Sequence, residues 1–258
     1  MLEFCTPLFL MGCPRSGTTF LANLLNADRR ILMTNETASF MLLDDLIKKS
    51  FKGIESGIMF GKEHNVHMSE MLDENYASLL ILYYERIALA EQRCSLSYWG
   101  EKHPHIFECL SRIEKQLPAS RYIYLIRDPR DCACSIAAMN RVDFSEALGV
   151  WIEIATIYQK FIASRLGEGI HTLRYEDMVA NPEHEITRLY RFLTLDVPSE
   201  VRDFLDERRN IDAHNLEVRK DFAKNSVARW RNELSLEQQD EARIRTDFFL
   251  NLYGYPCI

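Results

Sequence analysis

Apolar runs that end in turn residues mark the expected strands of this chain. Residues 7–12 form one such run, which ends at a Gly-Cys-Pro turn, and residues 121–127 form a second, which is followed by Asp-Pro. The sequence Ile-His-Thr-Leu-Arg-Tyr at residues 170–175 predicts a third strand. Continuous apolar strands are typical of parallel sheets that helices cover on both faces.

Helical periodicity fills most of the remaining chain. Residues 37–96 are mostly helical in pattern, apart from a stretch with glycine and histidine, residues 52–67, that we expect to be a loop. The C-terminal helix is expected to follow a serine cap and to end before Gly254. Expected helices therefore cover residues 18–26, much of 37–96, a segment from about Arg130, 182–193 and 235–252.

The order of these elements predicts an α/β fold. Strands that alternate with helices favour a three-layer, P-loop-like architecture with a central, mostly parallel sheet flanked by helices. No Pro/Gly/Ser-rich linker interrupts the sequence, so we expect a single domain over residues 1–258. Within it, residues 38–98 form a helical insertion between the first and second expected strands.

Charge and composition exclude several classes of protein. The chain has 31 Lys+Arg and 38 Asp+Glu and a net charge of −7, which argues against a nucleic-acid binder. Its seven cysteines have no C-x-x-C spacing, so neither a disulfide framework nor a structural zinc site is expected. No stretch approaches the roughly 20 apolar residues of a membrane helix, and no basic leader precedes the first apolar run. We therefore expect a cytoplasmic protein.

A candidate phosphate-binding loop follows the first expected strand. The segment Gly12-Cys-Pro-Arg-Ser-Gly-Thr-Thr matches the pattern G-x-x-x-x-G-K-[ST] except that Thr18 stands in the lysine position. Such a loop presents backbone N–H groups and the positive end of a helix dipole to an anion. Arg15 adds a planar cation, and further donors come from the hydroxyls of Ser16, Thr18 and Thr19 and the amide of Gly17.

The missing lysine bears on the reaction class. A nucleoside-triphosphate enzyme needs that lysine on the β- and γ-phosphates and an acidic residue for Mg²⁺, and no expected strand ends in such a residue. A degenerate kinase with the same strand-loop-helix start is the alternative phosphotransferase reading. A glycine turn that caps a helix for folding alone is the other alternative.

Two motifs resemble those of sulfotransferases that use 3′-phosphoadenosine 5′-phosphosulfate (PAPS). The loop Cys13-Pro-Arg-Ser-Gly-Thr-Thr-Phe-Leu is similar to their 5′-phosphosulfate loop in its arginine-bearing form. The segment Tyr124-Leu-Ile-Arg-Asp-Pro-Arg-Asp-Cys-Ala-Cys-Ser is similar to their 3′-phosphate element, with Arg127 and Ser135 eight residues apart as in the family. The resemblance implies that these two residues bind the 3′-phosphate. An ion pair of Arg127 with Asp128 or Asp131 is the alternative.

Candidate catalytic residues follow from the same resemblance. Asn35-Glu36-Thr37 is similar to the element of protein-tyrosine sulfotransferases that carries their base, and Gly100-Glu-Lys-His-Pro resembles their lysine element. The resemblance implies Glu36 as general base and Lys102 and Arg15 as the cations that support the transferring group. His103 is the rival base and Glu101 a weaker third. Glu36 as a simple cap and Lys102 as a solvated lysine remain the alternatives.

Further donor contacts are implied nearer the C-terminus. Leu173-Arg-Tyr-Glu-Asp-Met is similar to a segment whose tyrosine lies against the nucleotide, so Tyr175 is a donor-binding candidate, with a plain core tyrosine as the alternative. Ser226-Val-Ala-Arg-Trp-Arg resembles the segment that closes over the nucleotide. Arg229 and Arg231 alternate around Trp230, so a regular backbone would turn only one of them toward the donor.

The resemblance implies transfer of a sulfuryl group from PAPS to a hydroxyl or amine, with adenosine 3′,5′-bisphosphate (PAP) as product and no metal. The acceptor is expected to be a small molecule, a glycan or a peptide, bound on the side of residues 38–98. A P-loop kinase-like phosphotransferase and a non-catalytic nucleotide-binding module are the alternatives. No nucleic-acid partner and no integral membrane segment are expected, and the sequence does not determine the oligomeric state.

Overall fold

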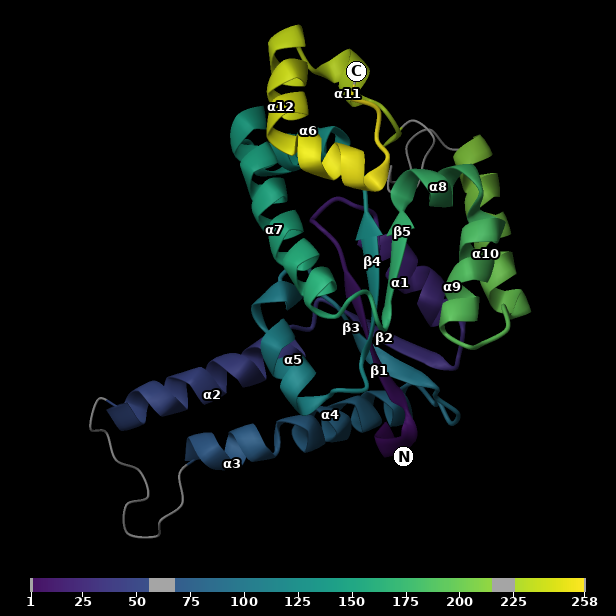
Figure 1. Cartoon of the computed structure of the whole chain (residues 1–258). Coiled ribbons are helices and arrows are strands. Elements are labelled where there is room, and N and C mark those ends of the chain that lie inside the picture. The colour runs from purple at the N-terminus through teal and green to yellow at the C-terminus, as the bar shows by residue number, and fades with distance from the viewer. Residues whose placement is uncertain (1, 56–67, 215–225, 258) are drawn as a thin grey trace. The chain divides into compact units, whose positions relative to one another are not determined.

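A five-stranded sheet carries the fold (Figure 1). The structure is a computed structural model, and it describes residues 2–55, 68–214 and 226–257. The strands run parallel in the order β2-β3-β1-β4-β5 and helices flank them, which confirms the expected α/β fold. Their bounds are β1 (Thr6–Met11), β2 (Ile31–Asn35), β3 (Tyr98–Lys102), β4 (Arg121–Ile126) and β5 (Ile170–Arg174).

Strands β2 and β3 are the two that sequence reasoning did not predict. Each has five residues, and β3 contains a glycine, a glutamate and a lysine that are all buried. The two strands pair in parallel, with Thr34 opposite Glu101 and Asn35 opposite Lys102. Burial of these polar residues depends on partners from the neighbouring strand and helices, so local periodicity alone did not reveal the strands.

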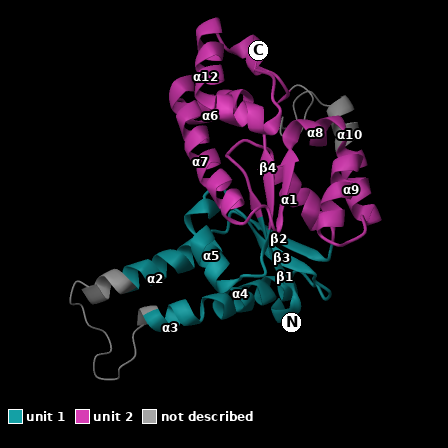
Figure 2. Ribbon diagram, in the orientation of Figure 1, with its two compact units in different colours: residues 1–9, 29–121 teal, residues 10–28, 122–258 magenta. Residues whose placement is uncertain are grey.

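The chain divides into two compact units (Figure 2). Unit 1 comprises residues 1–9 and 29–121, and unit 2 comprises residues 10–28 and 122–258. Strand β1 contributes to both units, because the division falls within it.

Unit 1 is built around an aromatic core. The ring of Phe40 lies 4.8 Å from Phe9, 5.9 Å from Tyr84 and 6.3 Å from Trp99, measured between centroids. Helix α2 extends to Glu55, so residues 52–55 of the expected loop are helical, and the rest of that loop lies outside the described residues. The helices of unit 1 are η1 (Leu2–Phe4), α2 (Ser39–Glu55), α3 (Met68–Glu74), α4 (Tyr76–Ala90), η2 (Ile106–Glu108) and α5 (Leu110–Gln116).

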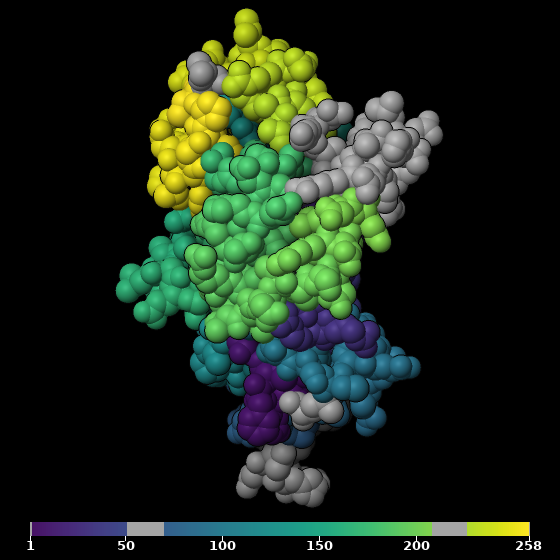
Figure 3. All heavy atoms as spheres, turned by 90° about the vertical axis from the view of Figure 1, so that its right-hand side faces the viewer, coloured from purple at the N-terminus to yellow at the C-terminus, as the bar shows by residue number. Residues whose placement is uncertain are grey.

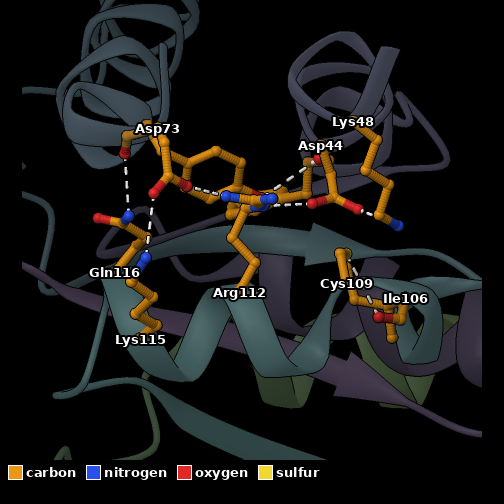
Figure 4. A network of polar contacts seen from close by, with 10 residues as sticks. Asp44, Lys48, Asp73, Ile106, Cys109, Arg112, Lys115 and Gln116 are labelled. Atoms are coloured by element: carbon orange, nitrogen blue, oxygen red, sulfur yellow. Dashed lines mark hydrogen bonds and ion pairs between the residues drawn. The ribbon is translucent and has the colours of Figure 1, made fainter. Parts of the chain in front are cut away.

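An ion-pair cluster joins three helices of unit 1 (Figure 4). Arg112 of α5 reaches between Asp44 of α2 and Asp73 of α3 and pairs with both. Lys48 pairs with Asp44 at 2.5 Å and Lys115 with Asp73 at 3.0 Å. Each of these acids therefore meets basic partners, and the cluster holds α2, α3 and α5 together.

Unit 2 places helices on both sides of β4 and β5 (Figure 1). Helices α6, α7 and α12 pack together on one side, and α1, α8, α9 and α10 lie on the other. Figure 3 shows the outer surface of the second group, where α8, α9 and α10 are in shades of green. The bounds are α1 (Thr18–Ala27), α6 (Pro129–Asn140), α7 (Phe144–Ser164), α8 (Tyr175–Ala180), α9 (Pro182–Phe192), α10 (Ser199–His214), α11 (Trp230–Glu233) and α12 (Leu236–Tyr253).

Several helix ends follow the expected capping chemistry. The side chain of Ser235 caps α12 in a reciprocal box with Gln238, and Gly254 ends that helix with a φ of 68°. Pro182 occupies the first turn of α9. Tyr175 was expected in the third strand, but β5 ends at Arg174 and Tyr175 begins α8.

Gly100 gives a test of the packing in unit 1. A Cβ at this position would lie 1.9 Å from the carbonyl oxygen of Leu8, and a backbone atom of a strand cannot move aside. We expect Gly100→Ala to lower the free energy of unfolding by about 3 kcal/mol or more, measured by urea denaturation. Gly149→Ala is the control, since its Cβ would meet only the flexible end of Arg245 at 3.3 Å. Equal stability of the two variants would contradict the strand pairing.

Candidate active site

The glycine loop after β1 lies where the strand order reverses. In the strand order, β2 and β3 lie on one side of β1, and β4 and β5 lie on the other. The order therefore reverses between β1 and β4, and ligands of α/β sheets bind at such switch points. Gly17 is the N-cap of α1, with a φ of 93° and no side-chain cap. The first amides of α1 therefore keep their hydrogen-bonding capacity for an anion.

Close packing fixes the glycines of this loop. A Cβ at Gly12 would lie 2.8 Å from the carbonyl oxygen of Leu125, and one at Gly17 would lie 2.8 Å from the ring of Tyr175. Larger residues would push the loop away from the strand end, so both positions require glycine.

The expected hydroxyl donors of the loop differ in accessibility. Thr18 and Thr19 open α1, where Thr18 is partly buried and Thr19 is exposed. Ser16 is buried, and its Oγ lies 3.5 Å from the sulfur of Cys132. The hydroxyl of Ser16 therefore supports the loop from inside in the free protein, whereas Thr19 is open to solvent.

Arg127 connects the loop to the C-terminal segment. It follows β4 and donates from Nη1 to the carbonyl of Arg15 at 2.8 Å and from Nη2 to the carbonyl of Ser226 at 2.5 Å. Its Nε is buried and has no partner among the described residues. Asp128 pairs with Arg130 instead, at 2.7 Å. Arg127 thus holds backbone groups on both sides and keeps one buried donor for a ligand.

Ser135 and Tyr175 complete this group. Arg15 donates from Nε to the hydroxyl of Ser135 at 3.0 Å. The ring of Tyr175 is 1% exposed, lies against Gly17, and carries the guanidinium of Arg127 at 4.5 Å from its centroid. Four of the residues singled out from the sequence therefore meet in unit 2 as one cluster of cations, hydroxyl and aromatic ring.

The segment before α11 is tied to the start of α6. The carboxylate of Asp131 accepts hydrogen bonds from the backbone N–H of Ala228 at 2.8 Å and of Trp230 at 3.0 Å. The ring of Trp230 lies 3.8 Å from the guanidinium carbon of Arg130 and 4.9 Å from that of Arg231. Sequence reasoning overlooked Asp131 in this role, although an acid in the first turn of a helix marks a capping position.

Arg229 and Arg231 take different places. Arg229 makes two hydrogen bonds to Glu233, at 2.8 and 2.9 Å, within the segment that forms α11. Arg231 stacks on Trp230. A ligand that binds Arg229 would have to displace its two hydrogen bonds to Glu233.

Unit 1 holds the other candidate residues at the ends of β2 and β3. Lys102, whose side chain is 3% exposed, pairs with the carboxylate of Glu36, which is 49% exposed. The hydrogen bond to Lys102 lowers the pKa of Glu36 below its ordinary value of 4.5. Glu36 is thus an ionised and accessible carboxylate, whereas Lys102 is sheltered.

His103 is partly exposed and has a fixed tautomer. The backbone N–H of His105 donates to its Nδ1 at 3.1 Å. Burial lowers the pKa of His103 below its ordinary value of 6.5. A neutral imidazole whose Nδ1 accepts carries its proton on Nε2, so Nε2 is a donor in the free protein.

Comparison with known proteins identifies the family. A model of the sulfotransferase family matches residues 7–199. The chain belongs to this family. It is 23% identical over 196 residues to protein-tyrosine sulfotransferase 1 of Danio rerio, a match that covers 73% of this chain and 53% of that protein.

Solved sulfotransferases share the fold. The sulfotransferase domain of an olefin synthase from Synechococcus PCC 7002 superposes with a TM-score of 0.65 and 18% identity, covering 95% of this chain and 94% of that one. Mouse sulfotransferase SULT7A1 complexed with PAP gives a TM-score of 0.58 and 16% identity, covering 98% of this chain and 91% of that one. The chain is also 25% identical over 238 residues to an uncharacterized protein of Aquifex aeolicus, a match that covers 87% of this chain and 30% of that protein. It therefore spans about a third and about half the length of these two curated relatives.

The described residues form neither a membrane-spanning helix nor a cluster of metal ligands. Across residues 2–55, 68–214 and 226–257, no helix is both long and apolar enough to span a bilayer. In the same part of the chain, no group of three or more His, Cys, Asp or Glu side chains is arranged to hold a metal ion.

Asp131 gives a pH-dependent test of the C-terminal tie. Burial raises the pKa of its carboxyl from 3.8 to about 6, so the folded state favours the protonated form. That contribution to stability is complete below pH 3.8 and is lost as the pH rises through about 6. Asparagine stays uncharged at every pH, so only the wild type loses this contribution. The free energy of unfolding of Asp131→Asn should therefore rise relative to that of the wild type by up to about 3 kcal/mol between pH 4 and 7.

Urea denaturation at several pH values measures this difference. Asp240→Asn is the control, because Asp240 is an exposed partner of Arg243 on α12. A constant difference between Asp131→Asn and the wild type across this range would contradict the raised pKa of the buried Asp131 carboxyl.

Proposed function

We propose that this sulfotransferase transfers the sulfuryl group of PAPS to a hydroxyl or amine of an acceptor, and that its PAP product leaves without help from a metal. The observation that carries the proposal is the buried Nε of Arg127, a charged donor with no partner among the described residues. A buried donor of this kind is costly to leave unpaired, and a phosphate oxygen would satisfy it.

The rest of the cluster in unit 2 suits the same ligand. The free helix amides after Gly17 and the cation of Arg15 fit the 5′-phosphosulfate, while Arg127 and Ser135 fit the 3′-phosphate. The ring of Tyr175 backs both the loop and Arg127. Thr18 in place of a lysine disfavours the kinase alternative, whose β- and γ-phosphates need that lysine.

The pair in unit 1 supplies acid–base chemistry. We assign proton removal to Glu36, because it is ionised at neutral pH and half exposed. As its carboxylate takes the proton, the acceptor atom forms a bond to sulfur, and the sulfur–oxygen bond to the 5′-phosphate breaks with its electron pair on the departing PAP. Lys102 and Arg15 would stabilise the charge that develops on the sulfuryl and bridging oxygens.

His103 is assigned a different role from the one expected of a rival base. Because Nδ1 is held by the N–H of His105, the proton of the neutral ring is on Nε2, and the ring can donate but not accept there. We therefore assign Nε2–H as a hydrogen-bond donor in the reaction. The fold does not determine whether the acceptor is a small molecule, a glycan or a peptide.

Calorimetric titration tests the donor. We expect PAP to bind more tightly than ATP with Mg²⁺, and we expect Arg127→Ala and Ser135→Ala each to weaken PAP about ten- to hundredfold through the loss of a charge-assisted contact. Ser145→Ala is the matched control, because the hydroxyl of Ser145 bonds to Glu241 and Arg245 on α12. Preference for ATP with Mg²⁺, or PAP affinity unchanged in both variants, would overturn the proposal.

Kinetics with PAPS and a panel of phenols, sugars, amines and tyrosine peptides tests the base. We expect Glu36→Gln to lower kcat by about a hundredfold or more, with PAP affinity kept within about twofold. Since the pKa of Glu36 is lowered, kcat/KM of the wild type should stay flat down to pH 4.5 or below. A fall that begins near pH 6 and disappears in His103→Ala would instead identify His103 as the base.

A further inference from the structure

A buried carboxylate lies directly beneath the segment that carries Glu36. Glu101 of β3 is fully buried, and among the described residues its carboxylate accepts hydrogen bonds from the three residues after Glu36. Its Oε1 accepts from the hydroxyl of Thr37 at 2.9 Å and from the backbone N–H of Ala38 at 2.6 Å. Its Oε2 accepts from the hydroxyl of Ser39 at 3.0 Å.

The segment needs this support because its backbone is strained. Glu36 has a φ of 58° and Ala38 a φ of 57°, in the left-handed region that costs an ordinary residue about 1–2 kcal/mol. The N–H of Glu36 donates to the carbonyl of Lys102 at 2.8 Å, which fixes one end of the turn. The contacts of Glu101 fix the other end, at the start of α2.

Neighbouring groups reinforce this arrangement. The hydroxyl of Tyr84 lies 2.8 Å from that of Thr34 and 3.3 Å from that of Ser39, and the hydroxyl of Thr34 donates to the carbonyl of Gly100 at 3.1 Å. Strand β3 thus presents consecutive residues with separate tasks. Glu101 points toward the turn after Glu36, and Lys102 points toward the carboxylate of Glu36 itself.

We propose that Glu101 is a positioning residue for the reaction: by accepting hydrogen bonds from Thr37, Ala38 and Ser39, it holds Glu36 in the left-handed conformation that directs its carboxylate to Lys102. This proposal rests on the proposed role of Glu36 as base. Glu101 does not remove the proton itself, because it is buried and its two oxygens are engaged.

The pKa of Glu36 in the free protein reports this role without any turnover. Lys102 lowers that pKa through a hydrogen bond and through its charge, and His103 and His105 lower it further through their charges. If the turn loosens, the contact with Lys102 weakens, and the pKa should rise toward 4.5. Carbon-13 NMR of the side-chain carboxyls over pH 2–7, with Glu36→Gln to assign the signal, measures it.

Glu101→Gln is the principal variant. Its amide keeps one acceptor oxygen for three donors, so we expect the pKa of Glu36 to rise, kcat to fall about tenfold or more, and PAP affinity by calorimetry to stay within about twofold. Glu185→Gln is the matched control, as Glu185 is also a buried carboxylate, paired with Arg188 on α9. A Glu36 pKa and a kcat in Glu101→Gln equal to those in Glu185→Gln would overturn the proposal.

Thr37→Val keeps the test decisive should Glu101→Gln fail to fold. Thr37 is exposed, and this change removes one hydroxyl donor to Glu101 and leaves the core intact. We expect the pKa of Glu36 to rise in the same direction by a smaller amount. An unchanged pKa of Glu36 in Thr37→Val and in Ser39→Ala would overturn the proposal. If that pKa responds but Glu36→Gln leaves kcat unchanged, only the assignment of Glu36 as base is refuted.

Discussion

The candidate donor site in unit 2 depends on the contacts that the guanidinium of Arg127 makes. The guanidinium joins the carbonyl of Arg15 in the glycine loop to the carbonyl of Ser226 near the C-terminus, and it rests on the ring of Tyr175. Segments separated by more than 100 residues therefore share one buried cation. Because two of its nitrogens are used by backbone groups, the third is presented to a ligand in a defined direction, at little further entropic cost on binding.

Buried carboxylates hold other segments by accepting hydrogen bonds from their backbone N–H groups. Asp131 accepts from the N–H groups of Ala228 and Trp230, and Glu176 accepts from the N–H of Asp128 at 2.9 Å and from the hydroxyl of Tyr255 at 2.9 Å. Glu101 does the same for the turn after Glu36. Burial raises the pKa of Asp131 and Glu176, so these contacts are made against a desolvation cost. Each ties a segment outside the sheet to a buried carboxylate on a helix or strand, and these contacts position the functional groups.

The sequence was most informative for features that neighbouring residues in the chain determine by themselves. The glycine loop and the caps of α12 were predicted because glycine turns and capping residues have short-range causes, whereas Arg127 was singled out through the resemblance to the 3′-phosphate element. Strands β2 and β3 and the role of Glu101 were not predicted, since they depend on the parallel register that sets Thr34 opposite Glu101. The pairing of Arg229 with Glu233 was missed for a related reason, as it requires the short helix α11.

Backbone strain separates the candidate site from ordinary helix ends. Among the described residues, Gln92, Arg141, Leu166 and Thr194 have positive φ just after helices α4, α6, α7 and α9, where left-handed residues commonly end a helix. Arg15, Glu36, Ala38 and Ala228 have positive φ just before helices α1, α2 and α11. No helix termination explains this second set, and every member lies in a segment that Arg127, Glu101 or Asp131 holds. Ordinary residues keep a left-handed conformation only where surrounding contacts hold them in it. The buried charged groups supply those contacts, and together with the left-handed residues they set the orientation of the functional loops.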